Sequence, residues 1–219
     1  MAGIISGDLI NSSMYAPDDL RSILEILKKE FQQIEKQFSD TAIFFELYRG
    51  DSFQGIVEDS SLALAIALQI KSAVNKYSKN EDAKNASPIA DIRISIGLGE
   101  VTYIENALAE SNGAAFQYSG RTLDTMKSQE MKIALTTKDQ DINSEFKVHL
   151  KFLDALTDRW SIASAEVVYY LLRNYKEQEI ARKVSRSQAA INQRKKAAGW
   201  EEIKLLLDRY KQVTKKHFA

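Results

Sequence analysis

The sequence predicts an α+β protein whose mixed first part is followed by an all-helical second part. Strand-like and helix-like segments alternate up to about residue 157, and from Trp160 onward the patterns are helical. The charge also divides. Residues 151–219 contain 15 lysines and arginines but 8 acidic residues, a net charge of +7, which leaves −7 for the preceding residues. We therefore expect two domains, 1–157 and 158–219, with different roles.

The first strand and the first helix have clear signals. Residues 2–10 are apolar around Gly7 and Asp8, which is typical of a buried strand that ends at a turn. Pro17 and the two aspartates after it predict a helix start, because proline fits the first turn and acidic side chains favour the positive end of the helix dipole. Apolar residues three and four positions apart extend this helix to about Phe38.

A hairpin and a second helix follow. Two strand-like segments, residues 41–48 and 52–57, flank the turn Arg49-Gly50-Asp51, and this arrangement predicts a β-hairpin. Residues 60–77 have a helical pattern. Residues 79–87 are polar and lack periodicity, so we expect a surface loop there.

The remaining strands complete a sheet. Alternating isoleucines predict a strand over residues 91–99, which a hairpin continues over 101–104. A helix over 113–128, a strand over 131–136 and helical residues 139–156 come next. The order is βαββαβ plus additions. With right-handed crossovers, it predicts a four-stranded antiparallel sheet with helices on one face, the ferredoxin-like arrangement.

Four helices are predicted in the second part, over residues 163–174, 177–184, 187–198 and 201–213. The two middle ones have the spacing of a helix-turn-helix. Ala181 is the small residue that a close helix crossing needs, and Ile180, Val184 and Ile191 are placed for the shared core. Ser185 occupies the turn position where glycine is commonest, and Ser187 can cap the second helix.

The outer face of that second helix carries side chains that suit double-stranded DNA. Arginine, glutamine and asparagine can pair with base edges in the major groove, whereas lysine and arginine mainly meet phosphates. A helical bundle with a solvated basic face, or a dimerisation module, is the alternative interpretation. The predicted DNA-binding residues are Arg186, Ser187, Gln188, Asn192, Gln193, Arg194, Lys195 and Lys196.

Two aspartates are expected to meet at one edge of the sheet. Asp8 ends the first strand and Asp51 lies at the hairpin tip that begins the third. In the ferredoxin-like order these strands are antiparallel neighbours, so the end of one meets the start of the other. Carboxylates that share a divalent cation with substrate phosphates are the usual ligands of Mg²⁺ or Mn²⁺. An ordinary turn-forming role for each aspartate is the alternative.

Four spans resemble the first strand, metal hairpin, glycine-bearing strand and following helix of class III nucleotide cyclases and the related diguanylate cyclases. They are IISGDLINSS, YRGDSFQGIV, DIRISIGLGEV and GAAFQYSGRTLDTMK. As a whole, the chain resembles the SatD-like proteins of bacteria, which pair such a domain with a C-terminal helix-turn-helix. The resemblance implies that metal is bound by Asp8, Asp51 and the Leu9 carbonyl. It also implies nucleotide binding by Ile10, Asn11, Ser12, Ser13, Gly97 and Gly99. The two glycines would let the neighbouring chain approach closely. A simple bulge or turn at these glycines is the alternative.

The chain departs from active cyclases in the helix after the glycine-bearing strand. Those enzymes carry an asparagine and an arginine there, which orient the ribose and stabilise charge on the transferred phosphoryl group. The corresponding positions are Ser119 and Leu123, and the candidate substitutes are Arg121 and Lys127. We therefore expect nucleotide binding rather than cyclase activity.

These observations predict a cytoplasmic bacterial DNA-binding regulator whose degenerate cyclase-like domain senses a nucleotide or a metal. We expect a homodimer, since helix-turn-helix proteins gain affinity by reading two half-sites. No membrane role is expected, because no apolar run approaches about 18 residues. With no cysteine and two histidines, any metal would need oxygen ligands. The alternatives are an active nucleotide cyclase or nucleotidyltransferase with regulatory C-terminal helices, and a non-enzymatic interaction scaffold.

Overall fold

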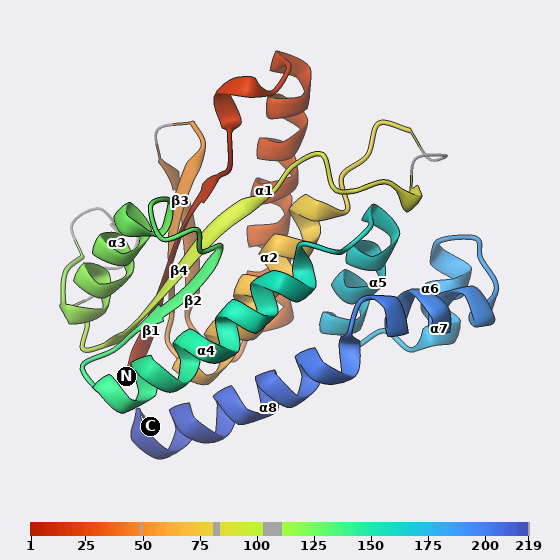
Figure 1. Cartoon of the computed structure of the whole chain (residues 1–219). Coiled ribbons are helices and arrows are strands. Elements are labelled where there is room, and N and C mark those ends of the chain that lie inside the picture. The colour runs from red at the N-terminus through yellow and green to blue at the C-terminus, as the bar shows by residue number, and fades with distance from the viewer. Residues whose placement is uncertain (49, 81–83, 103–110, 219) are drawn as a thin grey trace.

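The computed structural model describes residues 1–48, 50–80, 84–102 and 111–218. Within them the chain forms a five-stranded mixed sheet and eight α-helices (Figure 1). The strands are β1 (Ala2–Leu9), β2 (Ile43–Tyr48), β3 (Ser52–Val57), β4 (Ile92–Gly99) and β5 (Ile133–Thr136). Of the predicted segments, Arg49 in the hairpin turn, residues 81–83 in the surface loop and residues 103–104 lie outside the described residues.

The sheet order β2-β3-β1-β4-β5 contains the ferredoxin-like order in its first four strands. β1 is antiparallel to both β3 and β4, and β2 is antiparallel to β3. β5 lies parallel to β4, because a helix crosses over between them. The prediction of a four-stranded antiparallel sheet is therefore correct for β1 to β4. The strand predicted over residues 131–136 is present as β5, but the prediction did not include it as a parallel fifth strand of the sheet.

One face of the sheet is covered by α1 (Pro17–Gln37), α2 (Ala63–Asn75) and α4 (Gln140–Thr157). Their apolar side chains form the main core with sheet residues such as Ile5 and Leu9. α2 is the most deeply placed of the three, since almost every one of its residues is buried. It lies between the sheet and the C-terminal helices.

The opposite face is covered by α3 (Ala114–Met126), so the prediction of helices on one face alone is wrong. Ala115 packs there against Ala2, Ile4 and Ile56 in a second apolar cluster. Gly97 is the physical reason that the helix can lie so close. A Cβ atom at Gly97 would fall 2.1 Å from the Ala115 carbonyl oxygen, so a side chain at this position would force the helix off the sheet.

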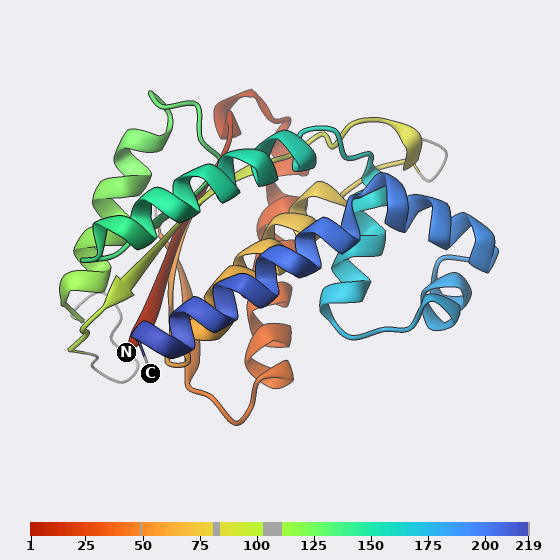
Figure 2. The same ribbon diagram turned by 60° about the horizontal axis from the view of Figure 1, so that its bottom comes forward.

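The four predicted C-terminal helices are present. They are α5 (Ile162–Leu172), α6 (Glu177–Lys183), α7 (Gln188–Ala197) and α8 (Trp200–His217), and α8 continues beyond its expected end at Val213. Figure 2 shows α8 running beside α4 back toward the edge where both termini lie. No helix among the described residues has the length and apolar character needed to cross a bilayer.

The C-terminal helices share the main core. Ile203 and Tyr210 of α8 belong to the same apolar cluster as the sheet residues. The Tyr210 hydroxyl donates to the Ser60 carbonyl at 2.8 Å, and the Trp160 indole N–H donates to the Ala198 carbonyl at 2.9 Å. The division into domains 1–157 and 158–219 stays a prediction, and such a boundary would pass through this shared core.

Candidate functional site

The two candidate metal-binding aspartates lie at the same edge of the sheet, where the strand order places them. Asp8 is opposite Ser52 in the β1–β3 register. The next N–H along β1, that of Leu9, donates to the carbonyl oxygen of Asp51 at 3.1 Å. The end of the first strand therefore meets the hairpin turn directly.

Each of these carboxylates already has partners. Arg93 on β4 faces Asp8 and donates to both of its carboxylate oxygens, with Nε at 2.9 Å from Oδ1 and Nη2 at 2.6 Å from Oδ2. Asp51 accepts hydrogen bonds from the Ser12 hydroxyl at 2.6 Å and from the Ser52 hydroxyl at 3.3 Å. The Asp8–Arg93 pair is largely shielded, with the side chains 26% and 15% exposed. Arg93 was not singled out by the sequence, because only the strand register brings it to Asp8.

This donor set does not fit a divalent cation as it stands. A metal at Asp8 would have to displace the Arg93 guanidinium, whose positive charge also repels a cation. Among the described residues, no group of three or more histidines, cysteines or acidic residues is arranged to hold a metal ion. Metal binding by Asp8, Leu9 and Asp51 therefore stays a prediction, and it requires Arg93 to move.

The segment after β1 only partly matches the expected phosphate-binding turn. Asn11 has a left-handed backbone (φ 55°) and precedes a short 3₁₀ helix, η1 (Ser12–Met14). The Ile10 N–H donates to the Asp91 carbonyl at 2.9 Å, so nucleotide binding by this N–H, which stays a prediction, would require that hydrogen bond to break. Within the described residues no acceptor engages the N–H groups of Asn11, Ser12 and Ser13, whose role stays a prediction.

The glycines and the cations assigned from the cyclase resemblance lie around α3. The backbone that approaches Gly97 and Gly99 belongs to α3 of the same chain. Ser119 is buried, and its hydroxyl is 3.0 Å from that of Ser6. Arg121 and Lys127 are exposed on the outer side of α3, and their catalytic roles stay predictions.

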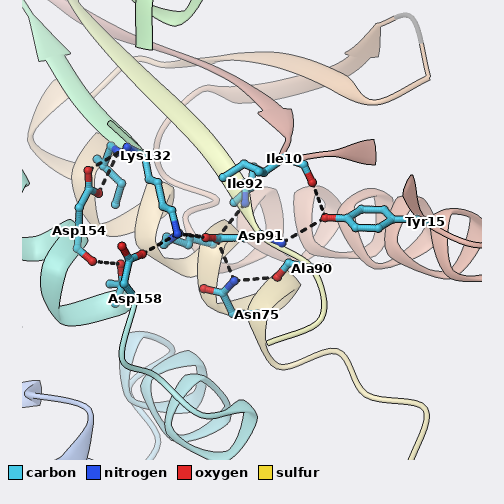
Figure 3. A network of polar contacts seen from close by, with 12 residues as sticks. Ile10, Tyr15, Asn75, Ala90, Asp91, Ile92, Lys132, Asp154 and Asp158 are labelled. Carbon is cyan, nitrogen blue, oxygen red and sulfur yellow. Dashed lines mark hydrogen bonds and ion pairs between the residues drawn. The ribbon is translucent and has the colours of Figure 1, made fainter. Parts of the chain in front are cut away.

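A network of charges joins the sheet to the helices at the same edge (Figure 3). Asp91 contacts the ammonium of the buried Lys71 at 2.5 Å and that of Lys132 at 2.9 Å. Burial alone would raise the pKa of Asp91, but these two cations outweigh it and lower the pKa to about 2. Lys132 also lies 2.6 Å from Asp158, just after α4. The network therefore links α2, β4, β5 and the end of α4.

Asp154 belongs to the same network, but its pKa is shifted in the opposite direction from that of Asp91. Its carboxylate accepts hydrogen bonds from the backbone N–H groups of Lys132 and Ile133, at 2.8 and 3.1 Å. Burial raises the pKa of Asp154 to about 6, because these hydrogen bonds only partly offset the loss of solvent. Together these contacts fix the start of β5 to α4.

α6 and α7 form two short helices joined by a tight turn and packed on α5. Val167, Ile180, Ala181 and Ile191 make a separate apolar cluster among the three helices. Ser185 adopts a left-handed backbone (φ 52°). The expected core and turn positions are therefore correct.

The Ser187 hydroxyl accepts a hydrogen bond from the Ala190 N–H at 3.2 Å, so the predicted cap of α7 is present. The predicted DNA-binding residues do not all face solvent. Arg194 lies 3.9 Å from Glu166, and Lys195 contacts Glu177 at 3.2 Å and Glu201 at 2.9 Å. Asn192 is half-buried. The exposed ones are Arg186, Ser187, Gln188, Gln193 and Lys196.

Together, the sheet order and the additional strand define an α+β protein of ferredoxin-like topology whose C-terminal helices pack into the same core. The family model of the SatD family matches residues 2–216, so the chain belongs to the SatD family. No curated protein matches the chain in sequence.

Several solved nucleotide-cyclase domains are similar in structure. The active GGEEF domain of a diguanylate cyclase from Vibrio cholerae is 18% identical over 63% of this chain and 83% of that chain, with a TM-score of 0.43. The guanylyl cyclase domain of the RhoGC fusion protein from Blastocladiella emersonii is 17% identical over 57% and 73%, with a TM-score of 0.41. The guanylate cyclase domain of RhGC from Catenaria anguillulae is 20% identical over 57% and 72%, with a TM-score of 0.37.

Proposed function

We propose that this protein is a regulator that binds double-stranded DNA through α6, the turn after it and α7. The observation that carries the proposal is the architecture of α7. It is capped by Ser187, held by its own small core on α5 and α6, and open to solvent along its outer face. A helix fixed from behind and polar in front can enter a major groove without rearranging.

The chemistry of that outer face suits base reading. Gln188, Asn192 and Lys196 follow one another at intervals of four residues, so they line one side of the helix. Amide side chains can make paired hydrogen bonds to adenine, and Lys196 can meet a phosphate. Ala189 is exposed beside this row and is small enough to let the helix approach the bases.

The ion pairs of α7 reduce the number of basic residues that can contact DNA phosphates. Arg194 and Lys195 are bound to carboxylates of the same chain, so they lose part of their attraction for DNA. Arg186 and Lys196 are exposed and are not ion-paired within the described residues. We therefore assign phosphate contacts to Arg186 and Lys196 and base contacts to Gln188, Asn192 and Gln193.

Salt-dependent binding of the full chain to duplex DNA tests this function. Lys196→Gln should weaken binding to all sequences alike and reduce the slope of log K against log salt by about one. Asn192→Ala should cost about 1–3 kcal/mol on the preferred sequence and relax the preference at one position. Lys127→Gln removes the same charge just after α3 and should change neither quantity. A full chain that ignores duplex DNA at low salt would refute the proposal.

Nucleotide binding at the sheet edge is a second candidate function. It is favoured by the open N–H groups of Asn11, Ser12 and Ser13 beside Asp51. Calorimetry with nucleoside triphosphates, with and without Mg²⁺, tests it. Heat that disappears in Asp51→Asn would support the site, whereas product formation with Mn²⁺ would instead favour the cyclase or nucleotidyltransferase alternative.

A further inference from the structure

A cavity of about 340 Å³ lies between the segment that precedes β4 and the turn that joins α6 to α7. Four of its lining residues are cationic, and they come from separate parts of the chain: Lys84 from that segment, Lys183 from α6, Arg186 from the turn and Arg194 from α7. The carboxylate among the lining residues is Glu166 of α5. Among the described lining residues, the cations therefore outnumber the carboxylates.

Glu166 is shared between two of the four cations. One of its oxygens lies 3.1 Å from the Lys84 ammonium, and the other lies 3.9 Å from the Arg194 guanidinium. All three side chains are at most 18% exposed. Glu166 therefore contacts Lys84 and Arg194, and among the described residues it forms no ion pair with Lys183 or Arg186.

Lys183 and Arg186 are not ion-paired within the described residues. The Lys183 ammonium lies 4.9 Å from the ring centroid of Tyr175 and 5.9 Å from that of Tyr170. Arg186 donates to the Ser185 carbonyl at 3.1 Å. Aromatic faces and a carbonyl offer partial negative charge but no counter-ion, so the mutual repulsion of the cations is only partly relieved.

We propose that this cavity binds a small phosphate-bearing molecule. Lysine and arginine together match a phosphate group, which accepts several charge-assisted hydrogen bonds at once. The volume is in the range of small-ligand sites, and Tyr170 offers an apolar wall beside the cations. The anion would supply a counter-ion for Lys183 and Arg186, which form no ion pair within the described residues.

Such a ligand would connect the sheet to the helices proposed to bind DNA. The segment around Lys84 is already docked on α5, where the Ala86 carbonyl accepts a hydrogen bond from the Ile162 N–H at 3.0 Å. The opposite wall is the turn from which α7 begins. A phosphate held by both walls would fix the orientation of α7, and this regulatory step, unlike the binding site itself, rests on the proposed DNA-binding function.

Orthophosphate is the probe for the test, added to the full chain at constant ionic strength and followed by calorimetry. We expect saturable binding that Lys183→Gln weakens about tenfold or more, the effect of losing one charge-assisted hydrogen bond. Because Lys183 is exposed, we expect the Lys183→Gln variant to fold as the wild type does, and circular dichroism checks its folding. Lys211→Gln, on the exposed face of α8 and outside the cavity, is the matched control and should bind phosphate as the wild type does.

Three results would overturn the inference. The first is the absence of saturable phosphate binding at millimolar concentration. The second is an equal loss of phosphate binding in Lys183→Gln and Lys211→Gln, which would indicate that any surface lysine contributes. The third is a loss of DNA binding in Lys183→Gln as large as its loss of phosphate binding, which would assign the cavity to the DNA backbone. Phosphate binding that depends on Lys183 in a protein that ignores duplex DNA would refute the DNA-binding function alone.

Discussion

At the residue scale, charged side chains at the sheet edge are governed by partners distant in the chain. Arg93 takes both oxygens of Asp8, although 85 positions separate the two residues. Lys71 and Lys132 likewise hold Asp91 in its ionised form. The same edge therefore contains one carboxylate with a low pKa, Asp91, and one with a raised pKa, Asp154.

Arg93→Gln tests whether the ion pair is what keeps a metal from Asp8. Removing the guanidinium should raise the affinity for Mn²⁺ about tenfold or more, because a cation a few Å away opposes a second one by well over 1 kcal/mol even at an effective dielectric near 20. Calorimetry with Mn²⁺ measures the change. The double variant Asp8→Asn with Arg93→Gln should lose the gain. A gain that persists there would exclude Asp8 as the ligand.

Asp154 predicts a pH dependence of stability. Its folded pKa of about 6 lies above the ordinary carboxyl value, so the folded protein holds this proton more tightly than the unfolded chain does. Its contribution is therefore fully present below the unfolded pKa and is lost as the pH rises toward about 6. Relative to Asp154→Asn, we expect the wild type to lose about 1–3 kcal/mol between pH 4 and pH 7. Urea unfolding at several pH values measures this difference, and parallel curves would contradict it.

At the element scale, α3 is positioned by glycine in the strand below it. Gly97→Ala should destabilise the protein by about 1–3 kcal/mol, because the added methyl would meet the backbone of α3. Gly120→Ala, within α3 itself, is the control. Its Cβ would have nothing within 4 Å, so the substitution should stabilise by up to about 1 kcal/mol. Thermal or urea unfolding compares the two, and equal effects would show that the close approach of α3 at Gly97 is not the cause.

The helical pair α6 and α7 is an element whose local features follow from its sequence. The left-handed turn at Ser185, the cap at Ser187 and the core contact of Ala181 all depend on residues within one short segment. The ion pairs of Arg194 and Lys195 depend partly on α5 and α8, outside that segment. The sequence of α6 and α7 alone therefore could not show which basic residues of α7 remain available for DNA phosphates.

At the scale of the whole molecule, the shared core predicts how the chain unfolds. Both tryptophans, Trp160 and Trp200, lie after residue 157, so fluorescence reports on the C-terminal helices, whereas far-ultraviolet circular dichroism reports on the whole chain. Because α8 and the sheet contribute to one apolar cluster, the two signals should change in one cooperative transition. Two separate transitions would instead support independent domains 1–157 and 158–219.

The sequence by itself determined the strands, the helices, the cap and turn of α7, and the order that brings Asp8 and Asp51 to one edge. These features follow from periodicity, propensity and connection rules, which act over a few residues or one crossover. Only the tertiary structure decided that α3 covers the second face of the sheet, that α8 packs into the sheet core and that Arg93 forms an ion pair with Asp8. Each of these outcomes depends on which distant side chains packing brings within a few Å, and no local pattern encodes that choice.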